Sequence, residues 1–160
     1  METNWFMGCD IGQDSFTFCL RSRSEIHLQG EVSNTLPSIR KWLKELHHLH
    51  HQDLRCILFC MEHTGVYGQI LMRELHQQHL LVCVEAAVNI KLSLGLQRGK
   101  NDKVDAQRIS EYAMRFTDRL KLWKPKRVVL QKLQTLNAGR NRLIKVRQIL
   151  QASLEATKRF

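Results

Sequence analysis

The apolar run Leu54–Met61 constrains the fold of this chain more than any other segment. It has the length of one strand and shows no alternation with polar residues, so it predicts a central strand that is covered on both faces. The run stops at the carboxylate of Glu62. A second buried strand is predicted at Trp5–Ile11, and its end reads Asp10-Ile11-Gly12. The chain should therefore fold around a sheet whose inner strands end in acidic residues.

The other segments alternate between the patterns of strands and helices. Further strands are expected at Ser15–Leu20, Ile26–Val32 and Leu80–Glu85. Helices are expected at Asn34–His51, at Val66–His79 and from Asn101 or Asp102 to about Phe116, with Asn34 or Thr35 as the N-cap of the first. Val88–Leu96 is expected to be a helix or an irregular connection, and Arg98–Asn101 a loop. The expected fold class is therefore α/β.

A long amphipathic helix is predicted from Arg127 onward. Its apolar residues recur at spacings of three and four, with an interruption where Arg140 follows Gly139, and they are Val129, Leu133, Leu136, Leu143, Val146, Leu150 and Leu154. Such a seam suits a helix that pairs with a second helix, so we expect a homodimer or a higher oligomer.

Charge is distributed unevenly along the chain. The 160 residues include 25 Lys or Arg and 15 Asp or Glu, which gives a formal charge of +10. Residues 1–80 hold 7 basic and 9 acidic side chains, whereas residues 81–160 hold 18 and 6. This asymmetry favours a polyanionic partner, such as nucleic acid, for the second half.

Neither export nor a membrane location is indicated. No run of about 18 apolar residues is present, and the first residues lack the basic region and cleavage site of a secretory signal. The five cysteines are odd in number and mostly lie in apolar runs, as reduced thiols do. We therefore expect a cytoplasmic protein without disulfides.

Four carboxylates stand where they can converge. Asp10 and Glu62 end predicted strands, and open α/β sheets bind ligands at the carboxyl ends of their strands. Asp102 and Asp105 share one face of a predicted helix. If these side chains meet, their mutual repulsion favours a cation among them, and oxygen ligands suit Mg²⁺ or Mn²⁺. Such centres activate a nucleophile and stabilise a leaving oxygen on phosphate.

Each of these acids also has a purely structural interpretation. Asp10 can cap a turn, and Glu62 can cap the helix that begins near Thr64. Asp102 and Asp105 can be first-turn acids that the helix dipole stabilises. Spacing alone leaves both interpretations open.

Three motif blocks resemble those of a known family. They read Gly8-Cys9-Asp10-Ile11-Gly12-Gln13-Asp14-Ser15-Phe16, then Met61-Glu62-His63-Thr64-Gly65-Val66-Tyr67, then Lys100-Asn101-Asp102-Lys103-Val104-Asp105-Ala106 with Ile109 and Tyr112-Ala113 after it. In this order and spacing they resemble the DEDD transposases of bacterial insertion sequences, the insertion-sequence 110 family, which includes the pilin-gene invertases. His63, Asn89 and Asn101 depart from the family pattern, but none of them removes a carboxylate.

The resemblance implies a fold, a reaction and a cofactor. The fold is ribonuclease-H-like of the RuvC type, a mixed five-stranded sheet flanked by helices, in residues 1–122, followed by a basic helical extension that starts a coiled coil in residues 123–160. Asp10, Glu62, Asp102 and Asp105 would be an acidic tetrad that binds Mg²⁺, with Mn²⁺ as a substitute, for DNA strand cleavage and exchange. The implied partners are DNA and a structured guide or bridge RNA, at the nucleoid in the bacterial cytoplasm.

One part of the family pattern is not met. Members continue into a second domain with a serine proposed as the strand-cleaving nucleophile, and no residue after Arg127 provides it. We therefore expect the catalytic domain of a transposase or site-specific recombinase that is incomplete for full strand exchange.

Basic residues close to the acids and on the long helix are the expected nucleic-acid contacts, although charge runs are also common on solvated surfaces. They are Arg98, Lys100, Lys103, Lys124, Lys126, Arg127, Arg140, Arg142, Lys145 and Arg147. The alternative function is a non-enzymatic nucleic-acid-binding and dimerisation module that retains the fold. Divalent-metal binding separates the two hypotheses.

Overall fold

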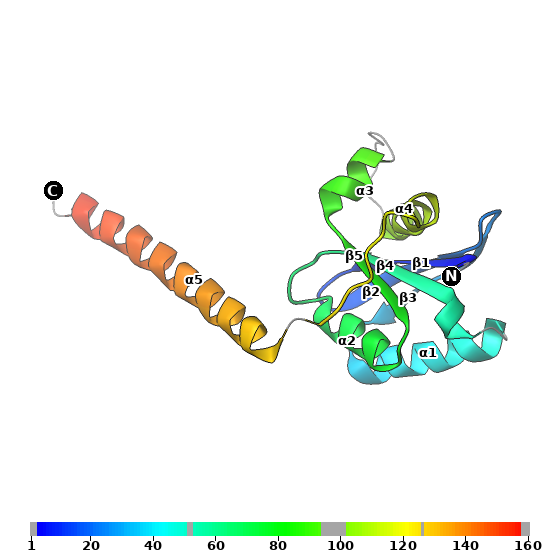
Figure 1. Cartoon of the computed structure of the whole chain (residues 1–160). Coiled ribbons are helices and arrows are strands. Elements are labelled where there is room, and N and C mark those ends of the chain that lie inside the picture. Colours follow the sequence, from blue (N-terminus) through cyan, green and yellow to red (C-terminus); the bar gives the residue numbers. More distant parts are fainter. Residues whose placement is uncertain (1–2, 51–52, 94–101, 126, 158–160) are drawn as a thin grey trace. The chain divides into compact units, whose positions relative to one another are not determined.

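The chain folds into two units, Met1–Lys124 and Pro125–Phe160. The computed structural model describes residues 3–50, 53–93, 102–125 and 127–157. The first unit is a sheet covered by helices, and the second is a single long helix (Figure 1).

The five strands of the first unit form one mixed sheet, as the sequence predicts. They are β1 (Trp5–Ile11), β2 (Ser15–Arg21), β3 (Ile26–Ser33), β4 (Ile57–Glu62) and β5 (Leu81–Glu85). Their order across the sheet is β3-β2-β1-β4-β5. β1, β4 and β5 are parallel, whereas β1, β2 and β3 follow each other as antiparallel hairpins. The parallel strands therefore end at one common edge.

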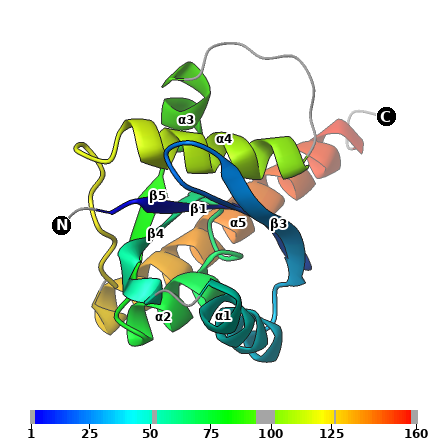
Figure 2. The ribbon, with the colours of Figure 1, turned by 90° about the vertical axis from the view of Figure 1, so that its right-hand side faces the viewer.

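Helices cover both faces of this sheet. They are α1 (Leu36–His50), α2 (Gln69–Gln77), α3 (Ala87–Ser93) and α4 (Asp102–Arg115). Figure 2 shows α1 and α2 on one face, and α3 and α4 on the other. Each face has its own core, because successive strand residues point to opposite sides. In β1, Met7 and Cys9 belong to the core beneath α1 and α2, whereas Phe6 packs with Ile109 and Tyr112 of α4.

The predicted strand at Leu54–Met61 begins late. Leu54–Cys56 forms one turn of 3₁₀ helix, and β4 starts only at Ile57. The side chain of Asp53 accepts a hydrogen bond of 3.0 Å from the amide of Arg55, and this cap favours the turn over an extended chain. Arg55 and Cys56 are exposed, so the apolar run was longer than the buried strand.

The structure decides between the two N-cap candidates of α1. Thr35 directly precedes the helix, and its carbonyl oxygen accepts a hydrogen bond of 3.0 Å from the amide of Ile39. Asn34 lies one residue earlier, and its Nδ2 donates hydrogen bonds of 3.0 Å to the carbonyl oxygens of Gly12 and Tyr67. The helix expected from Val66 starts at Gln69, after a turn in which Gly65 has φ of +66°. This left-handed conformation favours glycine. Residues 66–68 continue the turn, in which the amide of Gln69 donates a hydrogen bond of 3.2 Å to the carbonyl oxygen of Val66.

The segment after α4 closes the free side of β5. The amide of Trp123 donates a hydrogen bond of 2.7 Å to the carbonyl oxygen of Val82, and Leu122 bridges to Cys83. Trp123 packs against the core, and its ring meets His76 edge to face. This segment therefore protects a sheet edge that would otherwise expose unpaired backbone groups.

The second unit is the helix α5 (Val128–Thr157), whose 30 residues span about 45 Å. It runs through Gly139 and Arg140 without a break, so the interruption predicted there affects only the apolar seam. Its apolar side chains are exposed, with Leu136 at 70% and Leu143 at 73%. Among the described helices, none is long and apolar enough to cross a membrane.

Candidate functional site

Three acidic residues lie at the carboxyl ends of the three parallel strands. Cys9 pairs with Met61, so Asp10 lies beside Glu62 one step further along the same two strands. Glu62 in turn pairs with Glu85 of β5. Because neighbouring strands lie about 4.7–4.9 Å apart, the three backbone positions form a short row. All three residues are partly buried.

This row lies on the α4 face of the sheet. Cys60 and Cys83, two residues before Glu62 and Glu85, belong to the core beneath α4. Side chains two residues apart in a strand share a face, so Glu62 and Glu85 face α4. Asp10 is four residues after Phe6 in β1 and therefore also shares the face of Phe6, which packs against α4. The acidic row therefore lies directly next to the apolar core that α4 covers, at the carboxyl ends of the same strands.

Helix α4 begins close to the end of β1. Ala106 and Ser110 lie directly over Gly8, and Ala113 packs further back, in the core that contains Phe6. The helix and the strand therefore run in opposite directions, as Figure 2 also shows. The first turn of α4, with Asp102 and Asp105, is at the end where Asp10 lies.

Asp105 has a defined partner on its own helix. Its Oδ1 accepts a hydrogen bond of 2.8 Å from Nη1 of Arg108, and both side chains are partly buried. The side chain of Asp102 lies outside the described part of the chain, although its backbone starts α4. The structure therefore brings Asp10 and Glu62 to adjacent strand positions, with the start of α4 nearby.

Among the residues that the structure describes, no group of three His, Cys, Asp or Glu side chains is close enough to hold a metal ion. The chemistry of the candidate donors nevertheless fits Mg²⁺. Asp10, Glu62 and Asp105 offer only carboxylate oxygens, the ligand type that Mg²⁺ and Mn²⁺ prefer. Magnesium sites commonly use one or two carboxylates and complete their coordination with water and phosphate oxygens.

Glu85 is the acidic residue that the sequence analysis did not single out. Its Oε2 accepts a hydrogen bond of 3.1 Å from Nδ2 of Asn89. Burial raises the pKa of the Tyr112 phenol, and the neighbouring Glu85 raises it further. The signal was present in the sequence, because Leu81–Glu85 ends in an acid just as the two preceding parallel strands do.

Two buried cysteines near the acids, Cys9 and Cys60, lie on opposite faces of the sheet and remain protonated thiols. Burial raises the pKa of Cys9 far above its usual range, and Cys19 and Asp10 add to this effect. A hydrogen bond with Cys83 and burial raise the pKa of Cys60 in the same direction. Neither Cys9 nor Cys60 is therefore a thiolate that would act as a nucleophile or a soft metal ligand.

The predicted nucleic-acid contacts are distributed over both units. Lys103 is exposed on α4, and Lys124 is exposed at the end of the first unit. Arg127 precedes α5, and the exposed basic residues on that helix are Arg140, Arg142, Lys145 and Arg147. Arg98, Lys100 and Lys126 lie outside the described residues.

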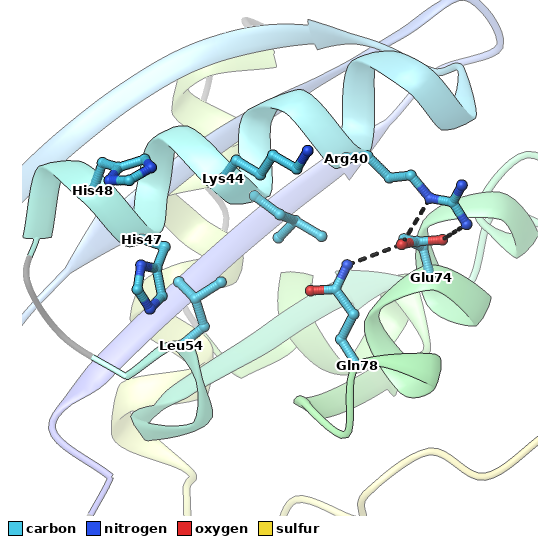
Figure 3. Close-up of a pocket in the computed structure, with 8 residues that line it drawn as sticks. Arg40, Lys44, His47, His48, Leu54, Glu74 and Gln78 are labelled. Atoms are coloured by element: carbon cyan, nitrogen blue, oxygen red, sulfur yellow. Dashed lines mark hydrogen bonds and ion pairs between the residues drawn. The ribbon is translucent and has the colours of Figure 1, made fainter.

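A separate pocket of about 460 Å³ lies between α1 and α2, on the other face of the sheet. Figure 3 shows that Arg40 points from α1 to Glu74 on α2, where Gln78 also reaches the same carboxylate. Both hydrogen bonds from Arg40 measure 3.1 Å. Because Glu74 is already satisfied by these donors, we assign this cluster to packing of the two helices and not to the acidic site.

Comparison with known families decides the identity of the chain. The model of the insertion-sequence 110 DEDD family, described as "Transposase", matches residues 7–157. The chain belongs to this DEDD transposase family. A comparison with curated proteins gives no match.

Comparison with solved structures bears on the fold expected for the DEDD family. The RuvC of T. thermophilus in complex with a Holliday junction substrate has a TM-score of 0.55 at 11% identity, covering 74% of this chain and 99% of that one. A second Thermus thermophilus RuvC structure has a TM-score of 0.47 at 12% identity, with the same two coverages. The match with a TM-score of 0.55 confirms the ribonuclease-H-like fold of the RuvC type.

Proposed function

We propose that this chain is the catalytic domain of a DNA transposase or site-specific recombinase, and that Asp10, Glu62, Asp102 and Asp105 hold Mg²⁺ for DNA strand cleavage and exchange. The observation that carries the proposal is the register of β1 and β4, which sets Asp10 beside Glu62 at the carboxyl edge of the sheet. The close packing of α4 on Gly8, which directs its first turn toward that edge, supports it.

Each residue has a role that follows from its position. Asp10 and Glu62 would provide rigid ligands, because both belong to central strands whose backbone is held on both sides. Asp102 and Asp105 would complete the set from the first turn of α4. Arg108 would keep the carboxylate of Asp105 oriented through their 2.8 Å ion pair. Bound Mg²⁺ supplies positive charge to the phosphate and lowers the pKa of a water molecule.

The proposed substrate is DNA. The neighbour in the T. thermophilus complex is a RuvC bound to a Holliday junction, and this chain shares its fold. Exposed basic residues on α4 and α5 would contact the phosphate backbone, and those on α5 are Arg140, Arg142, Lys145 and Arg147. A structured guide or bridge RNA is the second proposed partner, and its phosphates would bind to the same basic side chains.

The proposed assembly is a dimer that forms through α5. Its exposed leucines, such as Leu133, Leu136 and Leu143, would pair with a second copy of the helix. Full strand exchange would also need the serine domain that other family members are expected to carry. By this proposal, residues 1–160 are the metal-binding part of a composite active site.

The alternative is a module that binds nucleic acid without cleaving it. The ion pair between Asp105 and Arg108 favours it, because a carboxylate that already has a cation needs no metal to neutralise it. Under this alternative the fold and the basic helix remain, while the acids act as caps and structural partners.

Titration calorimetry with Mn²⁺ and Mg²⁺ tests the proposal. We expect binding to the wild-type chain and its loss in Asp10→Ala and Glu62→Gln. Asp118→Asn is the matched control, because Asp118 is exposed and follows the other end of α4. Absence of binding in all four proteins would establish the non-enzymatic module instead. Equal binding in wild type and Asp10→Ala would refute the assignment of the ligands.

A further inference from the structure

The loop after β4 exposes two apolar side chains beside the acidic edge. It follows Glu62 directly and leads through Gly65 into α2. Val66 is 70% exposed and Tyr67 is 44% exposed, although both are large side chains that usually lose exposure on folding. Both residues belong to the second motif block, Met61–Tyr67, and neither has a role in the proposed metal site.

Tyr67 is held firmly despite its exposure. Its hydroxyl donates a hydrogen bond of 3.3 Å to Oε1 of Gln13, in the turn that follows β1. Its carbonyl oxygen accepts a hydrogen bond of 3.0 Å from Nδ2 of Asn34, which is only 7% exposed. The same Nδ2 donates to the carbonyl oxygen of Gly12. One buried amide therefore joins the loop after β4 to the turn after β1.

These contacts place the ring of Tyr67 at a defined location. Gln13 lies three residues beyond Asp10, and the loop itself begins one residue after Glu62. The phenol ring thus lies at the end of the two strands that carry the first two acids. Its edge is fixed by the bond to Gln13, and part of the ring remains open to solvent.

We propose that Tyr67, assisted by Val66, is a platform on which an unpaired DNA base stacks next to the phosphate that is cleaved. The proposal rests on the proposed function, because it assumes that DNA enters this edge. Aromatic rings bind bases of any sequence through their flat faces, and apolar side chains help to separate neighbouring bases. A ring that is already immobilised loses little conformational entropy on binding.

Electrostatics also favour a base over a phosphate at this loop. Described residues 62–68 carry the carboxylate of Glu62 and no lysine or arginine, so the loop offers no fixed positive charge to a phosphate. An uncharged base avoids repulsion from the nearby carboxylates. Tyr67 would therefore orient the strand, which makes it a positioning residue and not a catalytic one.

Photo-crosslinking with the full 160-residue chain tests the proposal. The probe is a single-stranded DNA with one 5-iodouracil, which crosslinks to stacked aromatic side chains, and an RNA of the same sequence runs in parallel. We expect a crosslink on the peptide that contains Tyr67, stronger with DNA than with RNA. Tyr67→Phe should keep the crosslink, because the ring remains, and Tyr67→Ala should lose it.

Affinity and metal binding complete the test. At constant salt, Tyr67→Ala should weaken binding of the single-stranded DNA by about 5- to 150-fold, the range expected for one stacked base. Ile26→Ala is the matched control, because Ile26 is 43% exposed at the opposite end of the sheet. This variant should bind the single-stranded DNA with the affinity of the wild type.

The outcomes separate this proposal from the metal proposal. Mn²⁺ binding by Tyr67→Ala should equal that of wild type, so a metal site that fails in calorimetry leaves the crosslink result standing. Unchanged DNA affinity in Tyr67→Ala together with no crosslink at Tyr67 would overturn the platform. A stronger crosslink with RNA would overturn its assignment to DNA.

Discussion

Gly8 of β1 lies directly beneath Ala106 of α4. A methyl group at Gly8 would overlap the carbonyl oxygen of Ala106 and the amide nitrogen of Ser110, and it would lie 3.0 Å from the Cα of Ser110. The obstructing atoms are backbone atoms, which cannot turn away as a side chain can. Gly8 therefore sets how closely α4, and with it the first turn that carries Asp102 and Asp105, approaches the sheet.

The first prediction concerns this contact. Gly8→Ala should push α4 away from β1 and destabilise the protein by about 1–3 kcal/mol, as overpacked substitutions do. It should also weaken Mn²⁺ binding, because the acids of α4 move away from Asp10. Chemical denaturation and calorimetry measure the two effects.

A matched glycine provides the control for that prediction. A methyl group at Gly139 of α5 would meet no atom within 4 Å. Gly139→Ala should therefore stabilise the helix by about 0.5–1 kcal/mol and leave Mn²⁺ binding unchanged. Equal effects of the two substitutions would show that the packing of α4 on Gly8 does not control the site.

A second prediction distinguishes Glu85 from Glu62. Glu85 already accepts a hydrogen bond from Asn89 and is not part of the proposed tetrad, so Glu85→Gln should leave Mn²⁺ affinity unchanged. Glu62→Gln should lower the Mn²⁺ affinity by more than about 100-fold, since even substitution of residues that only contact metal ligands lowers metal affinity by 10- to 100-fold. A large loss of affinity in Glu85→Gln would instead make Glu85 a ligand.

The phenol of Tyr112 reports whether Glu85→Gln acts as intended. Burial and the carboxylate of Glu85 together raise the pKa of Tyr112 above 10.0. Removing the charge should lower this pKa, while burial keeps it above the usual value. An ultraviolet titration measures the change, and Tyr112→Phe identifies the signal.

A third prediction concerns the pH dependence of stability through Glu74. Hydrogen bonds from Arg40 lower the pKa of this buried carboxyl below 4.5, against the opposing effect of burial. The folded state therefore favours ionised Glu74, and its contribution is present above the unfolded pKa and lost as pH falls through the folded pKa. Glu74→Gln should cost about 1–2 kcal/mol at neutral pH and progressively less as the solution becomes more acidic than pH 4.5.

The exposed pair on α1 is the control for Glu74. Nζ of Lys41 lies 3.8 Å from Oε1 of Glu45, and both side chains are mostly exposed. Glu45→Gln should cost no more than about 0.5 kcal/mol at any pH, because water screens such pairs. A pH-independent cost of Glu74→Gln, measured by urea denaturation, would contradict the third prediction.

Sequence patterns predicted the strands well where burial and apolar character coincide. β1 has the predicted bounds, Trp5–Ile11, because its apolar run and its buried segment are the same. The start of β4 was wrong, because a local cap from Asp53 competes with strand formation and periodicity does not detect it. The choice between Asn34 and Thr35 as the N-cap of α1 could not be made from the sequence, because the partners of the Asn34 side chain lie in loops that are distant in the sequence.

The candidate site was only partly predictable. Asp10 and Glu62 follow apolar strand runs, so their place at the sheet edge could be read from the sequence. The row that includes Glu85 needs the register between β4 and β5, which pairing in three dimensions decides. Likewise, nothing local indicates that Asn34 and Gln13 hold Tyr67 in place.

A fourth prediction concerns the oligomeric state. A chain truncated after Lys124 keeps both cores of the first unit and loses the exposed seam of α5. It should remain folded and be monomeric, whereas the full chain should be a dimer. Light scattering after size-exclusion chromatography measures both masses, and an identical oligomeric state would refute pairing through α5.

The last prediction concerns the salt dependence of DNA binding. Each phosphate that a basic side chain neutralises releases counterions, so the slope of log affinity against log salt steepens by about 0.9 per neutralised phosphate of a duplex. Replacing Arg140, Arg142, Lys145 and Arg147 of α5 by glutamine should flatten the slope in proportion to the number of phosphates that these side chains neutralise. Lys41→Gln on α1 is the control, because Lys41 already pairs with Glu45. Filter binding of duplex DNA over a series of salt concentrations provides the slopes, and equal slopes in all three proteins would remove α5 from the DNA interface.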